Sequence, residues 1–226
     1  MSLRGQLARS ARGAEQPWLA VLASLFGLLA SELPTAPVLA YTARGWHEHE
    51  LWRLWTAHFV HYGSAHLWGD LLAFLVWAAL VERESRRALL LTLTVGAPLL
   101  MAALALTCPG LGQYRGLSGL DTALVIELIF LRGFASPPRA EERGLGPWLS
   151  RSMGSRALRS LAVFCLLLSA VKIVYEFYAG HALLARDLGN SASLLPAAHA
   201  FGALVGLGVC ICSPRAGLTQ SLTPQY

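Results

Sequence analysis

The chain has 226 residues, of which 55% are hydrophobic and only 14% are charged, whereas a soluble domain typically carries about 25% charged residues. Its mean hydropathy of +0.50 comes from long apolar runs, and a run of about 20 such residues can span a bilayer as a helix. These properties exclude an ordinary soluble domain. The net charge of +5 is not accompanied by a basic cluster interleaved with aromatic residues, so no nucleic-acid partner is expected.

Six apolar segments are predicted to cross the membrane as helices in one all-α domain, residues 1–226. They cover approximately residues 17–33, 64–82, 88–107, 117–133, 157–178 and 193–212. Residues 1–16 and 213–226 are then terminal tails. An alternative for residues 1–40 is a cleaved signal peptide, because arginines precede the first apolar run and Val38-Leu39-Ala40 resembles a cleavage site.

The basic residues are distributed unequally between the two sets of loops. Thirteen of the 18 Lys and Arg residues lie in the tails or in the loops after the second and fourth segments, and four lie in the other loops. Because short loops rich in Lys and Arg remain in the cytoplasm, both termini are predicted to be cytoplasmic. The aromatic stretch 46–62 is then predicted to lie in the outer membrane–water interface.

Four polar side chains inside the predicted spans fall at a similar depth in the outer leaflet, given a helical rise of 1.5 Å per residue. They are His66, Asp70, Ser118 and His199. Polar residues are costly in lipid and are therefore functional candidates. A serine becomes a nucleophile when a histidine takes its proton, so Ser118 is the candidate nucleophile and His199 its base. His66 and N–H groups at the start of the fourth span are candidate oxyanion donors.

Glycines flank the candidate nucleophile in Gly116-Leu117-Ser118-Gly119. They keep bulky side chains away from the serine, so Gly116, Leu117 and Gly119 are predicted to contribute to oxyanion binding or substrate positioning. The stretch is not the Gly-x-Ser-x-Gly turn of α/β-hydrolases, because its last position is Leu120.

The candidate base is followed by a second pair of glycines. Gly202 and Gly206 lie three and seven positions after His199, on the same helix face. Small residues spaced by four let transmembrane helices approach closely. A contact between Ser118 and His199 on different spans requires such an approach.

With these motifs the chain resembles the rhomboid family of intramembrane serine proteases. Trp52-Arg53 is similar to the family's Trp-Arg motif in the first outer loop, and His61 and His66 to its His pair entering the second span. The Gly-x-Ser-Gly motif and the Ala-His-x-x-Gly-x-x-x-Gly pattern starting at Ala198 also match. The resemblance implies a six-helix bundle, a Ser–His dyad without cofactor or metal, and transmembrane protein substrates within the lipid bilayer. Trp52 and Arg53 are expected to support packing at the site.

The chain departs from the family pattern at two positions. Many rhomboids have Asn where this chain has Asp70, and Tyr where it has Thr122. Burial disfavours a charged carboxyl group, so Asp70 is expected to be neutral and to donate a hydrogen bond in place of the amide.

The compact size and the Tyr114-Arg115-Gly116 stretch resemble the rhombosortase subfamily of bacterial rhomboids. Those process proteins with a C-terminal Gly-Gly signal, an apolar helix and a basic tail. The resemblance implies an endopeptidase that removes the membrane anchor of exported proteins. It would lie in the bacterial inner membrane, with its active site opening to the periplasmic side.

Several alternatives remain open from the sequence. The chain can be a general rhomboid protease of other transmembrane substrates, an inactive rhomboid-like chaperone, or a haem protein with His66 and His199 as axial ligands. Histidines of the first outer loop can bind a metal, although surface positions explain them more simply: His47, His49, His58 and His61.

The remaining charges of the spans have structural interpretations. Glu127 is expected to pair with Lys172, whose long side chain can reach toward it. Asp121, one turn below the candidate nucleophile, can line the cavity or cap a neighbouring group.

Overall fold

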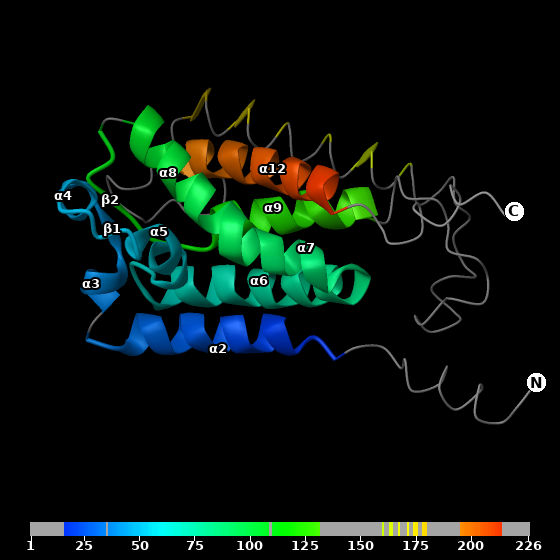
Figure 1. Ribbon diagram of the computed structural model, residues 1–226, viewed down its shortest axis with the longest axis horizontal. Coiled ribbons are helices and arrows are strands. Elements are labelled where there is room, and N and C mark those ends of the chain that lie inside the picture. The colour runs from blue at the N-terminus through cyan, green and yellow to red at the C-terminus, as the bar shows by residue number, and fades with distance from the viewer. Residues whose placement is uncertain are drawn as a thin grey trace, which may run out of the picture.

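The computed structural model describes residues 16–34, 36–108, 110–131 and 195–213, together with nine single residues between positions 160 and 179. Its long helices lie side by side, and the short elements gather at one end (Figure 1). The long helices are α2 (Trp18–Glu32), α6 (Ser64–Glu84), α9 (Ser118–Ile129), α12 (Leu195–Cys212), and a helix in three parts, α7 (Arg86–Leu91), η2 (Thr92–Gly96) and α8 (Ala97–Thr107). Helices therefore form at five of the six predicted segments.

Two described helices are long and apolar enough to cross a membrane, Ser64–Glu84 and Arg86–Thr107, while Trp18–Glu32 and Pro196–Cys212 are shorter apolar helices. Most of the predicted fifth span, 157–178, lies outside the described residues. The perimeter of the helix bundle carries exposed large apolar side chains, with Leu22 61% and Leu72 59% exposed. A bilayer covers such a surface favourably, because lipid tails are as apolar as these side chains.

The start of α2 is held by a carboxylate from another helix. Glu82, near the end of α6, accepts hydrogen bonds from Ala20 N at 2.9 Å and Leu19 N at 3.3 Å. The first N–H groups of a helix have no intrahelical acceptor, and an anion is favoured at that end of the helix dipole. Arg86 Nη2 lies 3.1 Å from the same carboxylate. The buried Glu82 therefore joins α2 to the α6–α7 corner.

The three-part helix contains a π-helical segment just before Pro98. Proline has no N–H group, so the carbonyl of Thr94, four residues earlier, receives no helical hydrogen bond from position 98. That carbonyl accepts instead from Trp55 Nε1 at 3.0 Å. The carbonyl left free by the proline thus links the outer loop to this helix.

The short elements at this end of the bundle, called the outer elements because the predicted orientation turns them outward, connect the loop after α2 with the segment that precedes α9. In chain order they are α3 (Ala36–Leu39), β1 (Tyr41–Thr42), α4 (Ala43–His47), α5 (Arg53–Thr56), η1 (Ala57–Phe59) and β2 (Gln113–Tyr114). The strands β1 and β2 pair antiparallel, with Tyr41 opposite Tyr114. This pairing brings the chain before Ser118 to the end of the bundle where α6 begins.

The helices α6, α9 and α12 all begin at the end that carries the outer elements (Figure 1). The core lies between them and includes Leu67, Phe74, Leu100 and Leu120, all at most 2% exposed. Because the three helices run in the same direction, the first residues of each can meet in one layer. The orientation in the membrane and the total of six spans remain predictions.

Candidate active site

Ser118 is the first residue of α9, and the backbone just before it has an unusual conformation. Gly116 has φ +124, a value that side chains with a Cβ rarely adopt. A Cβ at this position would also lie 3.0 Å from the His66 ring and 3.1 Å from Asp70 Oδ2. Glycine is therefore required at position 116, both for its backbone conformation and for the close approach of α6.

The helices α9 and α12 touch through their backbones. A Cβ added to Gly202 would collide with the carbonyl oxygen of Gly119, and one added to Gly206 would lie 2.5 Å from the carbonyl oxygen of Ala123. A Cβ on Gly119 would in turn lie 3.1 Å from the carbonyl oxygen of Ala198. The glycine pair predicted from the sequence is thus the contact surface between these helices.

This backbone contact brings the two candidate catalytic residues to the same place in the bundle. Ser118 directly precedes Gly119, and His199 directly follows Ala198. His199 is buried, with 5% of its surface exposed. Among the described residues, Ser118 Oγ is buried and makes no hydrogen bond. Catalytic hydrogen bonds are often long without substrate and tighten in the complex, so the arrangement is compatible with a serine and its base.

Asp70 is surrounded by groups that point at one of its oxygens. Leu117 N donates to Asp70 Oδ2 at 3.1 Å. The Nε2 atoms of His66 and His61 lie 3.2 Å and 3.5 Å from the same oxygen. This geometry favours a carboxylate that accepts hydrogen bonds. Because the Leu117 N–H can only donate, Oδ2 is the acceptor in this contact. The predicted role of Asp70 as a neutral donor, which would place its proton on Oδ1, stays a prediction.

The backbone N–H groups before the serine are already engaged. Leu117 N–H is bound by Asp70, and Gly116 N–H donates to the carbonyl of Ala57 at 3.1 Å. In this structure neither is directed at an oxyanion. The first N–H groups of α9, those of Ser118 and Gly119, have no acceptor within their own helix. They are therefore the better-placed backbone donors.

Two aromatic residues that were not predicted as site residues support this loop. Tyr114 donates its hydroxyl to the carbonyl of Gly116 at 3.2 Å and is 4% exposed. Burial raises the pKa of this phenol, so it remains a donor. His58 packs edge-to-face on Tyr114 at 5.6 Å between ring centroids and contacts the carbonyl of Ala97 through Nε2 at 3.0 Å. Burial lowers the pKa of His58 to about 4.

A layered stack of two side chains lies against His66. The ring of Tyr62 lies parallel to that of His66 within 11°, at 6.1 Å, and the guanidinium of Arg115 lies 5.3 Å from the centre of the Tyr62 ring. His66 therefore stays oriented by Tyr62 on one side and by Asp70 at its Nε2. An oxyanion contact by His66 can involve either ring nitrogen, because Nε2 faces Asp70 and Nδ1 is buried without a hydrogen-bond partner among the described residues.

Trp52 and Arg53 lie in the outer loop, where they pack against other residues of the same region. Arg53 bonds to Glu50 at 2.6 Å and to the carbonyls of Ala40 at 2.5 Å and Pro37 at 3.2 Å. Trp52 is 48% exposed. The Trp-Arg motif therefore supports the loop, and none of these contacts reaches Ser118.

The other ionisable residues of α9 have different surroundings. Glu127 is buried and accepts a hydrogen bond from Thr92 Oγ1 at 2.5 Å. Its predicted partner Lys172 lies outside the described residues. Asp121 Oδ1 is buried and makes no hydrogen bond within the described part of the chain. Glu127 thus joins α9 to the π-helical segment, well away from the serine.

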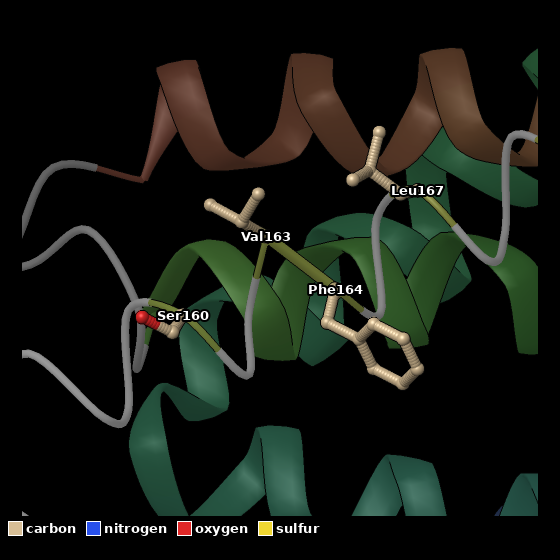
Figure 2. Close-up of a pocket in the computed structure, with 4 residues that line it drawn as sticks. All are labelled: Ser160, Val163, Phe164 and Leu167. Carbon is tan, nitrogen blue, oxygen red and sulfur yellow. The ribbon is translucent and has the colours of Figure 1, made fainter.

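A shallow apolar pocket lies elsewhere on the molecule (Figure 2). Its lining residues are Ser160, Val163, Phe164 and Leu167. None of the candidate catalytic residues contributes to it. Its side chains are largely exposed, as expected for a face in contact with lipid. Among the described residues, no group of three or more His, Cys, Asp or Glu side chains is arranged to hold a metal ion.

The comparisons with known proteins identify the fold in which this site lies. The family model described as Rhomboid domain matches residues 48–214. The chain belongs to the rhomboid family. Rhomboids are intramembrane serine proteases that act on transmembrane substrates within the lipid bilayer, and this rhomboid is accordingly an integral membrane protein. A search of curated proteins found no match.

Proposed function

We propose that this rhomboid is a serine endopeptidase that uses Ser118 as nucleophile and His199 as general base. The observation that carries the proposal is the backbone contact between Gly119 of α9 and Gly202 of α12. Larger residues would separate the helices and, with them, the serine and the histidine. A serine protease needs these two side chains within hydrogen-bond reach during the reaction.

The reaction follows from the roles of these groups. Ser118 Oγ attacks the scissile carbonyl while His199 takes its proton, and His199 then protonates the departing amine. The resulting acyl-enzyme is hydrolysed by water, which His199 activates in the same way. The negative oxygen of the tetrahedral intermediate is stabilised by the free N–H groups at the start of α9, where the helix dipole favours an anion.

Gly116, Leu117, His66 and Asp70 support this centre in different ways. Gly116 supplies the positive-φ turn, and Asp70 holds the Leu117 amide. His66 lies against both of them and is the side-chain candidate for a second oxyanion contact. Trp52 and Arg53 maintain the outer loop, and Gly202 and Gly206 maintain the helix contact.

We also infer the substrate class from the surroundings of the serine. The chain around Ser118 is glycine-rich, so a small residue before the scissile bond fits best. A helix must open locally to present a carbonyl, and Gly lowers helix stability by about 1 kcal/mol relative to Ala. A Gly-Gly pair ahead of a C-terminal anchor helix satisfies both requirements and agrees with the rhombosortase resemblance. Cleavage would release an exported protein on the periplasmic side of a bacterial inner membrane.

The test uses a fluorophosphonate probe, which reacts with activated serines. The purified wild-type protein should be labelled on Ser118, as mapped by peptide mass spectrometry. Ser118→Ala and His199→Ala should both lose labelling and substrate cleavage while remaining folded in detergent. Their combined loss should be no larger than either single loss, because the two residues act as one unit. Cleavage at near-normal rate by Ser118→Ala would refute the assignment.

The substrate proposal needs its own experiment. A client carrying a Gly-Gly pair, an apolar helix and a basic tail should be trimmed by the wild type and should accumulate uncut with Ser118→Ala. Normal trimming of this client, combined with loss of cleavage of an unrelated transmembrane protein, would leave a general rhomboid protease.

A further inference from the structure

A chain of polar contacts leads from the first described helix to the nucleophile. Ser31, near the end of α2, contacts His61 Nδ1 through its Oγ at 3.1 Å. On its other side, His61 Nε2 lies 3.5 Å from Asp70 Oδ2, a contact too long to be a hydrogen bond in this structure. Asp70 Oδ2 in turn accepts from Leu117 N at 3.1 Å, one residue before Ser118. Three segments distant in the sequence are therefore linked through side chains.

The Ser31 hydroxyl lies within hydrogen-bond distance of two acceptors. It is positioned to donate to the carbonyl of Phe59 at 3.1 Å or to His61 Nδ1, also at 3.1 Å. A hydroxyl has one proton and can make only one of these donations. If it donates to Nδ1, a neutral His61 carries its proton on Nε2, from which it can donate to Asp70 when the 3.5 Å contact shortens. If it donates to Phe59, His61 donates from Nδ1 to Ser31, and its Nε2 faces the carboxylate as an acceptor.

His61 is suited to this role because it is neutral and enclosed. It is 6% exposed, and burial lowers its pKa. A neutral imidazole has one N–H, so the two tautomers differ in whether Asp70 receives a hydrogen bond. A carboxylate that is bound by His61 holds its orientation toward the Leu117 amide more firmly.

We propose that Ser31 and His61 are positioning residues for the nucleophile: by selecting the His61 tautomer that donates to Asp70, they fix the carboxylate that holds the Leu117 amide. The inference rests on the proposed Ser118 chemistry for its effect on rate. Neither residue touches the reacting atoms, and both act through Asp70.

The first test is Ser31→Ala, with Ser24→Ala as the matched control. Both serines lie on α2, but Ser24 Oγ donates only to the carbonyl of Ala20 at 2.8 Å, within its own helix. Ser31→Ala should slow fluorophosphonate labelling of Ser118 by about five- to tenfold, the range for loss of one hydrogen bond. The kcat for peptide cleavage should fall equally, with KM unchanged. Ser24→Ala should label at the wild-type rate, and Ser31→Thr, which keeps a hydroxyl, should restore it.

The second test asks whether the effect passes through Asp70. In an Asp70→Ala background, adding Ser31→Ala should cause no further loss of labelling, because the chain is already interrupted. A further loss of the same size as in the wild type would overturn the proposal, as would wild-type labelling by Ser31→Ala.

Hydrogen exchange of the backbone separates this inference from the proposed function. Ser31→Ala should lower the protection of the Leu117 amide, and Ser24→Ala should leave it unchanged. Unchanged protection in Ser31→Ala overturns the positioning role even if Ser118 is the nucleophile. Absence of any wild-type labelling refutes the proposed function, while the exchange comparison still decides whether the contact chain holds Leu117.

Discussion

Gly202 packs so closely on Gly119 that a Cβ at position 202 would collide with the Gly119 carbonyl oxygen. Gly206 repeats the contact one turn later against Ala123. The carbonyls involved belong to the helix that begins with the candidate nucleophile. The separation of α9 and α12 is therefore set by backbone contact, and it fixes how closely Ser118 and His199 can meet.

Gly202→Ala should displace α12 from α9 and lower labelling of Ser118 by about 100-fold, since a misplacement of about 1 Å at a reacting pair has this effect. The matched control is Gly208→Ala on the same helix, where an added Cβ meets nothing within 4 Å. It should label at the wild-type rate and be as stable or more stable, because Ala favours a helix over Gly. Equal labelling of the two variants would show that the helix contact does not set the active-site geometry.

Asp70→Asn should retain labelling within about tenfold of the wild type, because the amide oxygen can still accept from Leu117 N. Asp70→Ala should fall by about 10- to 100-fold, since a hydrogen bond to a charged group contributes about 1.5–3 kcal/mol. Asp121→Asn is the control for a change of carboxylate near Ser118. A full rate in Asp70→Ala would exclude both an oxyanion and a positioning role for this residue.

Acid should destabilise the protein partly through His58. Its pKa is about 4 in the folded protein, because burial disfavours the imidazolium, against 6.5 for the exposed group. The unfolded chain therefore binds a proton below pH 6.5 that the folded chain does not bind until about pH 4. The stability contributed by neutral His58 is complete above pH 6.5, and about 3 kcal/mol of it is lost as the pH falls to 4.

The measurement is thermal unfolding in detergent between pH 7 and 4, comparing the wild type with His58→Gln. The glutamine can still donate toward the carbonyl of Ala97 but does not titrate. The wild type should lose stability more steeply than the variant as the pH falls. Parallel curves would show that burial does not shift the His58 pKa.

The distribution of basic residues predicts that the segment around Gly110 faces outward and that Cys212 is on the cytoplasmic side. Gly110→Cys has open space for a side chain, and Cys212 is exposed. In variants with a single cysteine, a membrane-impermeant maleimide should react with position 110 in intact cells and with Cys212 only after permeabilisation. The opposite pattern would invert the topology and place the proposed site at the cytoplasmic surface.

Much of the helical framework is predictable from the sequence because it follows local rules. The apolar run at 64–82 forms the helix Ser64–Glu84, and Ser85 begins the next helix by accepting from Ala88 N at 3.1 Å. The close contact of Gly202 with α9 also follows from spacing. The number of spans and their orientation rest on hydropathy and charge alone.

The partners of Asp70 and Ser31 were not predictable in the same way. Whether Asp70 donates or accepts depends on the position of the Leu117 amide, 47 residues away in the chain. The contact between Ser31 and His61 spans 30 residues and joins a helix to a loop. Periodicity describes which face of a helix is buried, but it does not describe which polar atoms from separate segments meet there.

The hydrogen bond from Trp55 to the carbonyl freed by Pro98 has a mechanical consequence. Two residues after Trp55, the carbonyl of Ala57 receives the N–H of Gly116. The outer loop is thus bonded to η2 on one side and to the turn before the nucleophile on the other. A tilt of the helix that contains η2 would be transmitted through these two hydrogen bonds to the turn before Ser118, which couples the alignment of the serine to the tilt of a neighbouring helix.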